Sequence, residues 1–161
     1  MTIKDIHFSV EIYNSDDELT RADAELLTAA RKVTSHAYAP YSNFLVGAVA
    51  VLANGKTVSG TNQENASYPV GICAERVLLS SIASQYPGVG VDTIAISYNN
   101  TNGESNHPIS PCGICRQSLA EYQERVNMPI RIIMGGMKGE VFIIKNARHL
   151  LPLSFNASDL A

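Results

Sequence analysis

The spacing of apolar residues along the chain predicts its secondary structure. A first helix is indicated by an apolar stripe at intervals of three and four residues: Leu26, Ala30, Val33 and Ala37. Upstream, Ser15 and Glu18 have the S-x-x-E spacing of a capping box, which predicts that this helix starts there. Pro40 predicts its end, because proline cannot continue a helix.

Five segments have the pattern of strands. Residues 44–52 form a continuous apolar run, and the Asn54-Gly55 pair after it is a strong hairpin signal. Residues 57–62 are therefore predicted to be its antiparallel partner. Further strands are predicted at residues 91–98, 130–134 and 141–144. The apolar-rich stretch 6–13 is compatible with a short additional strand.

Two more helices lie between these strands. One starts near Cys73 and ends at Tyr86; the other follows a polar loop and Pro111, and its inward stripe is Cys115, Leu119, Tyr122 and Val126. The order of elements predicts an α/β fold, a three-layer α-β-α sandwich around a mixed five-stranded sheet. We expect residues 1–20 to form an N-terminal extension and residues 21–161 to form one domain.

Composition and charge narrow the functional classes. The 161 residues suit one domain, and 12 basic against 15 acidic residues give a net charge of −3. This balance provides no basic patch for nucleic acid or for an anionic membrane. No apolar run approaches the roughly 18 residues of a membrane span, and the N-terminus lacks the apolar core of a secretory signal. With only three cysteines, the sequence predicts a cytoplasmic protein that binds neither nucleic acid nor membranes.

The positions of the three cysteines indicate a metal site. Cys112 and Cys115 form a C-x-x-C after Pro111, and both Cys73 and this pair fall at predicted helix starts. Helix N-termini stabilise thiolates, which are good zinc ligands, and C-x-x-C spacing lets two sulfurs reach one ion. Three protein ligands leave the fourth tetrahedral position open for water, as in catalytic zinc sites. A redox-active C-x-x-C pair is the alternative.

Glu75 can join this site only if the local backbone is right. Two residues after Cys73 in a regular helix, it would point about 200° away, so Cys73 must occupy the helix cap. The sequence [His/Cys]-Ala-Glu followed by Pro-Cys-x-x-Cys is the pattern of zinc-dependent base deaminases. It is present here as Cys73-Ala74-Glu75 and Pro111-Cys112-Gly113-Ile114-Cys115.

Around these motifs, the chain resembles the homotetrameric zinc-dependent cytidine deaminases from about residue 24 to residue 160. The resemblance rests also on the segments 39–48, 62–69 and 150–155, which read APYSNFLVGA, NQENASYP and LLPLSF. It implies a cytidine deaminase-like catalytic domain with one Zn²⁺ per subunit, bound by Cys73, Cys112 and Cys115. A homotetramer with active sites shared between subunits is also implied.

The resemblance further implies a set of substrate contacts. Phe44 is expected to stack on the pyrimidine, and the Ala74 N–H to bind its O2 carbonyl. Asn62 and Glu64 are expected to hydrogen-bond the 3′ hydroxyl of the sugar. The remaining substrate-binding candidates are Tyr68, from the same loop as Glu64, and Phe155, which is expected to reach a neighbouring subunit's active site.

These expectations define a reaction. Glu75 would move protons during the hydrolytic deamination of cytidine and 2′-deoxycytidine to the uridine nucleosides and ammonia, a step of pyrimidine salvage. Three thiolates around Zn²⁺ leave a net charge of −1, so Arg76 is expected to offset it by donating hydrogen bonds to a cysteine sulfur.

Three alternatives differ in substrate or in class. One is a deaminase of a cytosine-containing antibiotic such as blasticidin S, which shares the zinc motif. Another is a non-catalytic binding module stabilised by zinc, although such sites need a fourth ligand and His36, His107 and His149 have no ligand spacing. A polynucleotide-editing deaminase is disfavoured by the net negative charge.

Overall fold

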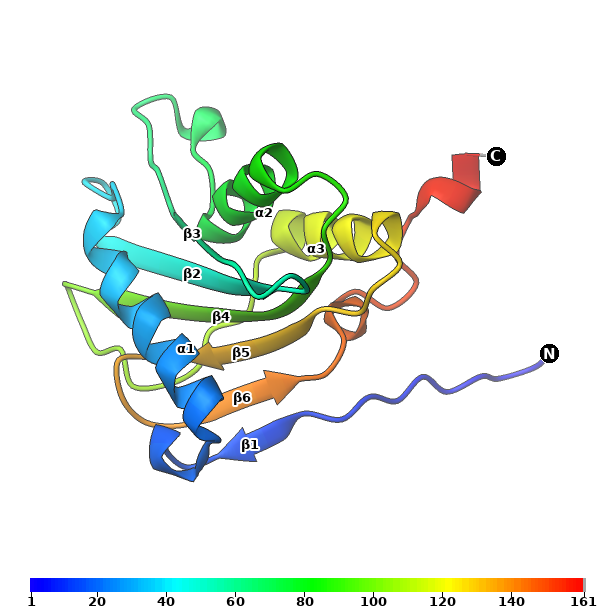
Figure 1. Ribbon diagram of the computed structural model, residues 1–161, viewed down its shortest axis with the longest axis horizontal. Helices are drawn as coiled ribbons and strands as arrows, with labels where there is room; N and C mark the ends of the chain where they lie inside the picture. The colour runs from blue at the N-terminus through cyan, green and yellow to red at the C-terminus, as the bar shows by residue number, and fades with distance from the viewer. Residues whose placement is uncertain (161) are drawn as a thin grey trace.

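A mixed β-sheet forms the centre of the protein, whose computed structural model describes residues 1–160 (Figure 1). Within these residues the sheet has six strands, in the order β1-β6-β5-β4-β2-β3. Their bounds are β1 Glu11–Tyr13, β2 Phe44–Leu52, β3 Thr57–Thr61, β4 Val91–Asn100, β5 Arg131–Gly135 and β6 Val141–Ile144. Only β4 and β5 pair in parallel, so the sheet is mixed as predicted.

Three α-helices cover the two faces of the sheet. They are α1 (Arg21–Val33), α2 (Ala74–Gln85) and α3 (Gly113–Arg125), and Figure 1 shows α1 on one face with α2 and α3 together on the other. This arrangement confirms the three-layer sandwich. No helix within residues 1–160 is both long and apolar enough to span a membrane.

Strand alternation divides the core into two clusters. The smaller one lies under α1 and joins Leu26, Leu27 and Ala30 to one face of the central strands. The larger one lies under α2 and α3, and its fully buried members include Leu52, Leu78, Ile82, Ile94, Ile96, Leu119, Ile130 and Ile132. Because successive strand residues point to opposite faces, the even-numbered residues of β2 and β4 face α2 and α3.

The predicted start and end of the first helix are wrong. Residues Asp16–Glu18 form a separate 3₁₀ turn, and Ser15 accepts no capping hydrogen bond. The N-cap is Thr20, whose hydroxyl accepts a hydrogen bond from the Asp23 N–H at 3.2 Å. The α-helix ends at Val33, well before Pro40, and a 3₁₀ turn follows it. The Thr20 hydroxyl thus takes the capping role predicted for Ser15, whereas the Asp23 carboxylate binds Arg131 and does not complete a capping box.

The sheet contains one strand more than the five predicted. The additional strand, β1, lies within residues 1–20 and pairs antiparallel with β6 at the sheet edge, Ile12 opposite Phe142. It covers only the last part of the apolar stretch 6–13. The preceding residues are exposed, including Ile6 and Phe8.

Two contacts fix the helices on the sheet. A Cβ at Gly60 of β3 would lie 2.5 Å from the Leu78 nitrogen and 2.6 Å from the Ala74 oxygen, so only glycine allows α2 to approach this closely. On the opposite face, the Arg131 guanidinium of β5 binds the Asp23 carboxylate of α1 through two hydrogen bonds of 2.6 and 2.9 Å. The Arg131 contact holds the pKa of Asp23 below its usual range.

Candidate metal centre and cleft

Two helix starts bring the three cysteines together. Cys73 is the N-cap of α2 and Cys112 the N-cap of α3, both with extended backbone, and Cys115 lies in the first turn of α3. The Cys73 carbonyl accepts the Arg76 N–H, and the Cys112 carbonyl accepts the Arg116 N–H. The expected cap position of Cys73 is therefore confirmed.

The spacing of the sulfurs fits a tetrahedral zinc. The Sγ atoms of Cys73 and Cys112 are 3.7 Å apart, those of Cys112 and Cys115 are 3.5 Å apart, and all three lie within 4.8 Å of one another. Two sulfurs bound to one tetrahedral zinc at about 2.3 Å are about 3.8 Å apart. The distances also exceed the roughly 2 Å of a disulfide bond, and all three thiols are free. The donor set therefore fits zinc.

The crowded sulfurs alter one another's acidity. The pKa of Cys73 falls to about 6, mainly because the Cys115 thiol donates a hydrogen bond to it, and the charge of Arg76 adds to the effect. The same contact, together with burial, raises the pKa of the Cys115 thiol. One thiolate thus forms readily, and a cation among the sulfurs stabilises the others, as in metal binding coupled to proton release.

The part of the chain that the structure describes offers no fourth protein ligand to this site. Within residues 1–160, no other Cys, His, Asp or Glu belongs to the group that could hold the ion. A structural zinc site has four protein ligands, whereas three leave a position for water or substrate. The geometry therefore favours a catalytic site over a purely structural one.

Glu75 is a buried carboxylic acid beside the thiols. It is the second residue of α2 and only 5% exposed. Burial raises the pKa of its carboxyl group, and this rise is partly opposed by its own backbone N–H and by the neighbouring Cys115 side chain. An acid with a raised pKa in a metal pocket is suited to taking up and releasing protons.

Two arginines flank the centre in different ways. Arg116 braces α3: its Nε donates to the Pro111 carbonyl at 2.8 Å, and its Nη1 donates to the Leu150 carbonyl at 3.1 Å. Arg76 lines a groove between α2 and α3, and no side-chain hydrogen bond joins it to a sulfur within residues 1–160. The position of Arg116 directly after Cys115 is the only sequence signal for its bracing role.

Phe44 lies at the start of β2, half-buried and stacked on another aromatic ring. The rings of Phe44 and Tyr98 have centroids 4.8 Å apart and an interplanar angle of 15°. By strand alternation they share the sheet face of Val46 and Ile96, which α2 and α3 cover. Tyr98 was not among the residues expected at the site.

The side chain of Asn62 is largely occupied by the neighbouring strand. Its Nδ2 donates to the Phe44 carbonyl at 2.9 Å, and its Oδ1 accepts the Val46 N–H at 2.7 Å. The amide thus replaces the backbone partner that β2 lacks beyond the end of β3. This arrangement leaves one N–H of Nδ2 for another acceptor.

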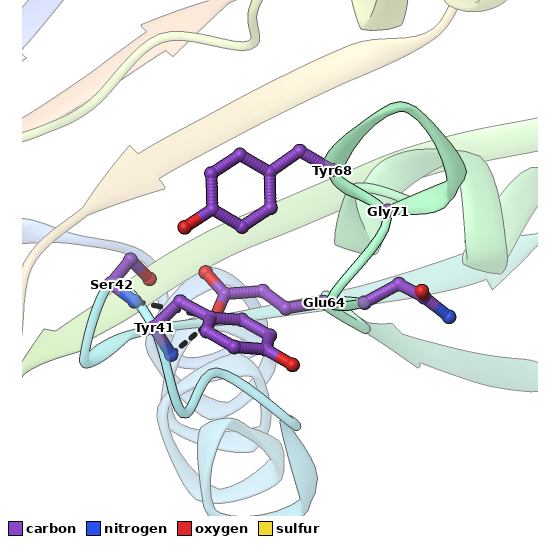
Figure 2. A pocket seen from close by; sticks show the side chains of 6 residues that line it. Tyr41, Ser42, Glu64, Tyr68 and Gly71 are labelled. Carbon is purple, nitrogen blue, oxygen red and sulfur yellow. Dashed lines mark hydrogen bonds between the residues drawn. The ribbon is translucent and has the colours of Figure 1, made fainter.

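Glu64 lies in a cleft of about 360 Å³, also lined by Tyr41, Ser42, Asn65, Tyr68 and Gly71 (Figure 2). Its Oε2 accepts the N–H groups of Tyr41 at 2.9 Å and Ser42 at 3.3 Å, and contact with Ser42 lowers the pKa of Glu64. Tyr68 overhangs the carboxylate, with its ring centroid 5.7 Å from that of Tyr41. The lining contains no thiol and not Glu75, but Gly71 is two residues from Cys73.

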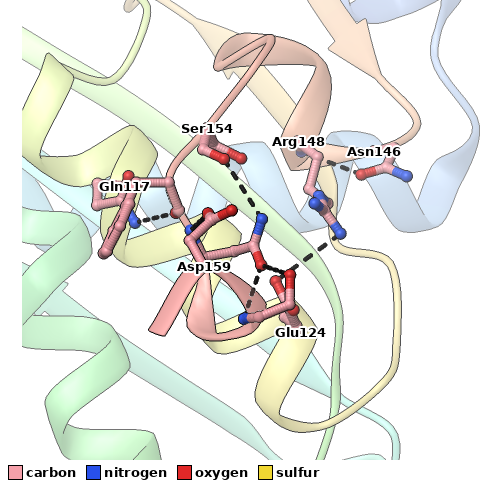
Figure 3. A network of polar contacts seen from close by, with 9 residues as sticks. Gln117, Glu124, Asn146, Arg148, Ser154 and Asp159 are labelled. Carbon is pink, nitrogen blue, oxygen red and sulfur yellow. Dashed lines mark hydrogen bonds and ion pairs between the residues drawn. The ribbon is translucent and has the colours of Figure 1, made fainter. Parts of the chain in front are cut away.

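Phe155 lies on the C-terminal segment that returns beside α3. Gln117 of α3 donates a hydrogen bond to the Phe155 carbonyl at 2.9 Å (Figure 3). The Phe155 side chain is 59% exposed, and nearby Leu153 is 91% exposed. Within this chain, Phe155 is therefore not buried against its own metal centre.

Comparison with known proteins identifies the family. The family model described as the cytidine and deoxycytidylate deaminase zinc-binding region matches residues 20–129. The chain is 34% identical over 135 residues to the cytidine deaminase of Halalkalibacterium halodurans, a match that covers 84% of this chain and 95% of that protein. It is 44% identical over 94 residues to the cytidine deaminase of Mycoplasma pneumoniae, covering 57% and 65% of the two chains.

Solved structures of similar proteins support the same family assignment. The crystal structure of cytidine deaminase from Burkholderia pseudomallei matches with a TM-score of 0.71 and 40% identity, over 85% of this chain and 100% of that one. The enzyme from Mycobacterium tuberculosis matches with a TM-score of 0.61 and 30% identity, over 81% and 94% of the two chains. The protein is thus a zinc-binding deaminase of the α/β class. Within that class, the chain belongs to the cytidine and deoxycytidylate deaminase family.

Proposed function

We propose that this protein catalyses the zinc-dependent hydrolysis of cytidine and 2′-deoxycytidine to uridine and 2′-deoxyuridine, with release of ammonia. One observation carries the proposal: three thiols at tetrahedral spacing sit at two helix starts, next to the buried acid Glu75. Family membership supplies the substrate class, because the relatives named above are cytidine deaminases.

The residues of the chain divide the chemistry between them. Cys73, Cys112 and Cys115 hold the zinc, which when bound acts as a Lewis acid that activates water for attack. Glu75 accepts a proton from the attacking water and delivers it to N3 of cytosine. As C4 gains the water oxygen, Glu75 carries the second water proton to the exocyclic amine, which leaves as ammonia. One water is consumed, and uridine remains.

The pyrimidine is held by residues around Glu75. Phe44 stacks on the pyrimidine, and the Ala74 N–H donates to its O2 carbonyl. Ala74 is the first residue of α2, where backbone N–H groups have no acceptor within the helix. Arg76 compensates the negative charge of the thiolates through space, as its effect on the pKa of Cys73 suggests.

The sugar is recognised in the cleft of Figure 2. The Oε2 of Glu64 is anchored by two backbone N–H groups, so Oε1 is oriented to accept the 3′ hydroxyl. The free N–H of Asn62 donates to the same hydroxyl, and Tyr68 closes the cleft over the ribose. These contacts do not involve the 2′ position, so cytidine and 2′-deoxycytidine are both substrates.

The active enzyme is proposed to be a homotetramer in which Phe155 completes the active site of a neighbouring subunit. Its exposure supports this arrangement, as does that of Leu153 on the same segment and of Ile114 in the first turn of α3. Because the thiols must stay reduced to bind zinc, we place the enzyme in the cytoplasm. Its reaction there is a step of pyrimidine salvage.

A substrate panel tests this function. Purified, zinc-loaded protein is incubated with cytidine, 2′-deoxycytidine, cytosine, adenosine, blasticidin S and single-stranded DNA, and ammonia is measured. We expect turnover of the two cytosine nucleosides and poor turnover of free cytosine, because ribose contacts help to position the reacting carbon. Turnover of blasticidin S alone, or of no compound with full zinc loading, contradicts the proposal.

A further inference from the structure

Tyr98 contacts both Phe44 and the loop that leads to Cys112. Its side chain is 1% exposed and lies on the face of β4 that is covered by α2 and α3. In the antiparallel register it is directly opposite Val46, and Phe44 is therefore its diagonal neighbour on the same face. The nearly parallel rings of Tyr98 and Phe44, with centroids 4.8 Å apart, show that this diagonal contact is a true stack.

The hydroxyl of Tyr98 reaches the loop that precedes α3. It lies 3.3 Å from Nδ1 of His107, within hydrogen-bond distance, and the two rings meet edge-on with centroids 5.8 Å apart. His107 is exposed, on the polar segment that runs from β4 to Pro111 and Cys112. Tyr98 thus contacts Phe44 through its ring and the approach to Cys112 through its hydroxyl.

We propose that Tyr98 is a positioning residue for the pyrimidine, acting through Phe44 and held in place by His107. The inference rests on the proposed function, which puts Phe44 against the base. A ring stacked on one face by a buried partner keeps a fixed plane, and its other face can then meet a pyrimidine in one orientation. The contact with His107 fixes the Tyr98 ring and gives a hydrogen-bond partner to a hydroxyl that would otherwise be buried without one.

Substitution of Tyr98 should therefore weaken the binding and orientation of the pyrimidine base. Tyr98→Leu removes the stack but leaves an apolar side chain of core size. Tyr98→Phe keeps the stack and removes only the contact with His107, as does His107→Ala from the other side. Stacked aromatic pairs contribute enough to change a binding constant by about two- to tenfold.

The test is a steady-state comparison of the zinc-loaded variants with cytidine. Tyr98→Leu should raise KM by about two- to tenfold and raise the inhibition constant of uridine in parallel, with a smaller change in kcat. Tyr98→Phe should recover most of the wild-type KM. Adding His107→Ala to Tyr98→Phe should change KM less than twofold further, because both substitutions remove the same contact.

Tyr122→Phe is the matched control. Tyr122, on α3, is also a buried tyrosine, and its ring does not stack on Phe44. Its hydroxyl donates to the Val89 carbonyl at 2.9 Å. This variant should keep the wild-type KM at equal zinc content. The inference is overturned if Tyr98→Leu keeps the KM and uridine affinity of the wild type, or if Tyr122→Phe shifts them equally. An inactive wild type instead refutes the proposed function, so the two failures are distinguishable.

Discussion

The sulfurs of Cys73 and Cys112 lie 3.7 Å apart, and each cysteine is the N-cap of a different helix. The pairing places two helix starts, with their unpaired N–H groups and partial positive charge, around one group of thiols. It also explains how Glu75 can share the site. Since Cys73 precedes the regular turns of α2, the helical rotation between the two residues does not separate them.

Removing the metal should abolish activity and lower the thermal stability. Without an ion, three sulfurs within 4.8 Å of one another repel as thiolates or share protons. We expect dialysis against a chelator and reductant to eliminate ammonia release and to lower Tm, and added Zn²⁺ to restore both. Metal content is followed by elemental analysis. Full activity of protein shown to be metal-free would contradict the assignment of the centre.

Replacing Glu75 with glutamine should separate catalysis from metal binding. Glutamine keeps the size of the side chain but cannot accept and release a proton. Glu75→Gln should retain about one zinc per chain and lose roughly 10²- to 10⁴-fold in kcat. Both are measured on the same preparation. If the variant with full zinc keeps turnover within tenfold of wild type, another group must move the protons.

Adding a methyl group at Gly60 should disturb the metal centre by displacing α2. The new Cβ would be 2.5 Å from the Leu78 nitrogen, and backbone atoms cannot move aside as a flexible side chain can. We expect Gly60→Ala to lower the free energy of unfolding by about 1–3 kcal/mol. It should also weaken zinc binding, because Cys73 caps the displaced helix.

Gly113→Ala provides the comparison for unfolding. A Cβ there would meet nothing within 4 Å, and the position is the first residue of α3. Its unfolding free energy in denaturant should stay within about 0.5 kcal/mol of wild type. Equal destabilisation by the two substitutions would show that the close approach at Gly60 is not responsible.

Local sequence patterns predicted most of the fold. The apolar runs of β2 and β6 were bounded correctly at both ends, because strand propensity and a turn signal coincide there. The first helix was placed too early because Ser15 and Glu18 satisfy a capping pattern, but Asp16 is instead bound by Arg31 of α1. That ion pair joins residues distant in sequence and has no local signal.

The candidate site was predictable only where a motif carries its chemistry. The cysteines and Glu75 have spacings dictated by a metal and a helix cap, so they could be placed from the sequence. The Asn62 amide hydrogen-bonds the backbone of β2 because the chain leaving β3 runs beside β2. The stack of Tyr98 on Phe44 depends in the same way on strand register. Neither relation leaves a pattern along the chain.

The ion pair between Asp23 and Arg131 should make stability depend on pH in the acid range. Arg131 lowers the pKa of Asp23 below 3.8 in the folded protein, so the unfolded chain binds the proton more readily. The contribution is complete above pH 3.8 and is lost as the pH falls through the lower, folded value. Asp23→Asn should therefore cost about 1.5–3 kcal/mol at pH 7 and progressively less as the pH falls below 3.8.

Urea unfolding at several pH values measures this difference. Glu25→Gln is the control, because the Arg21–Glu25 pair lies on the exposed face of α1, with side chains 92% and 64% accessible. Its loss at pH 7 should be much smaller, as for exposed pairs in general. A penalty for Asp23→Asn that is the same at pH 7 and pH 2.5 would show that charge is not its origin.

Mixing two defective variants should reveal whether Phe155 acts across a subunit boundary. Phe155→Ala leaves Glu75 intact but removes the aromatic side chain offered to the neighbour, and we expect about a tenfold loss of kcat/KM. Glu75→Gln leaves Phe155 intact. If Phe155 completes a neighbouring site, subunits exchanged by mild denaturation and refolding will form sites that combine an intact Glu75 with an intact Phe155. Ammonia release by the mixture should then exceed the average of the two parents refolded separately. Activity equal to that average, in a preparation that sediments as a tetramer, would mean that Phe155 serves only its own chain.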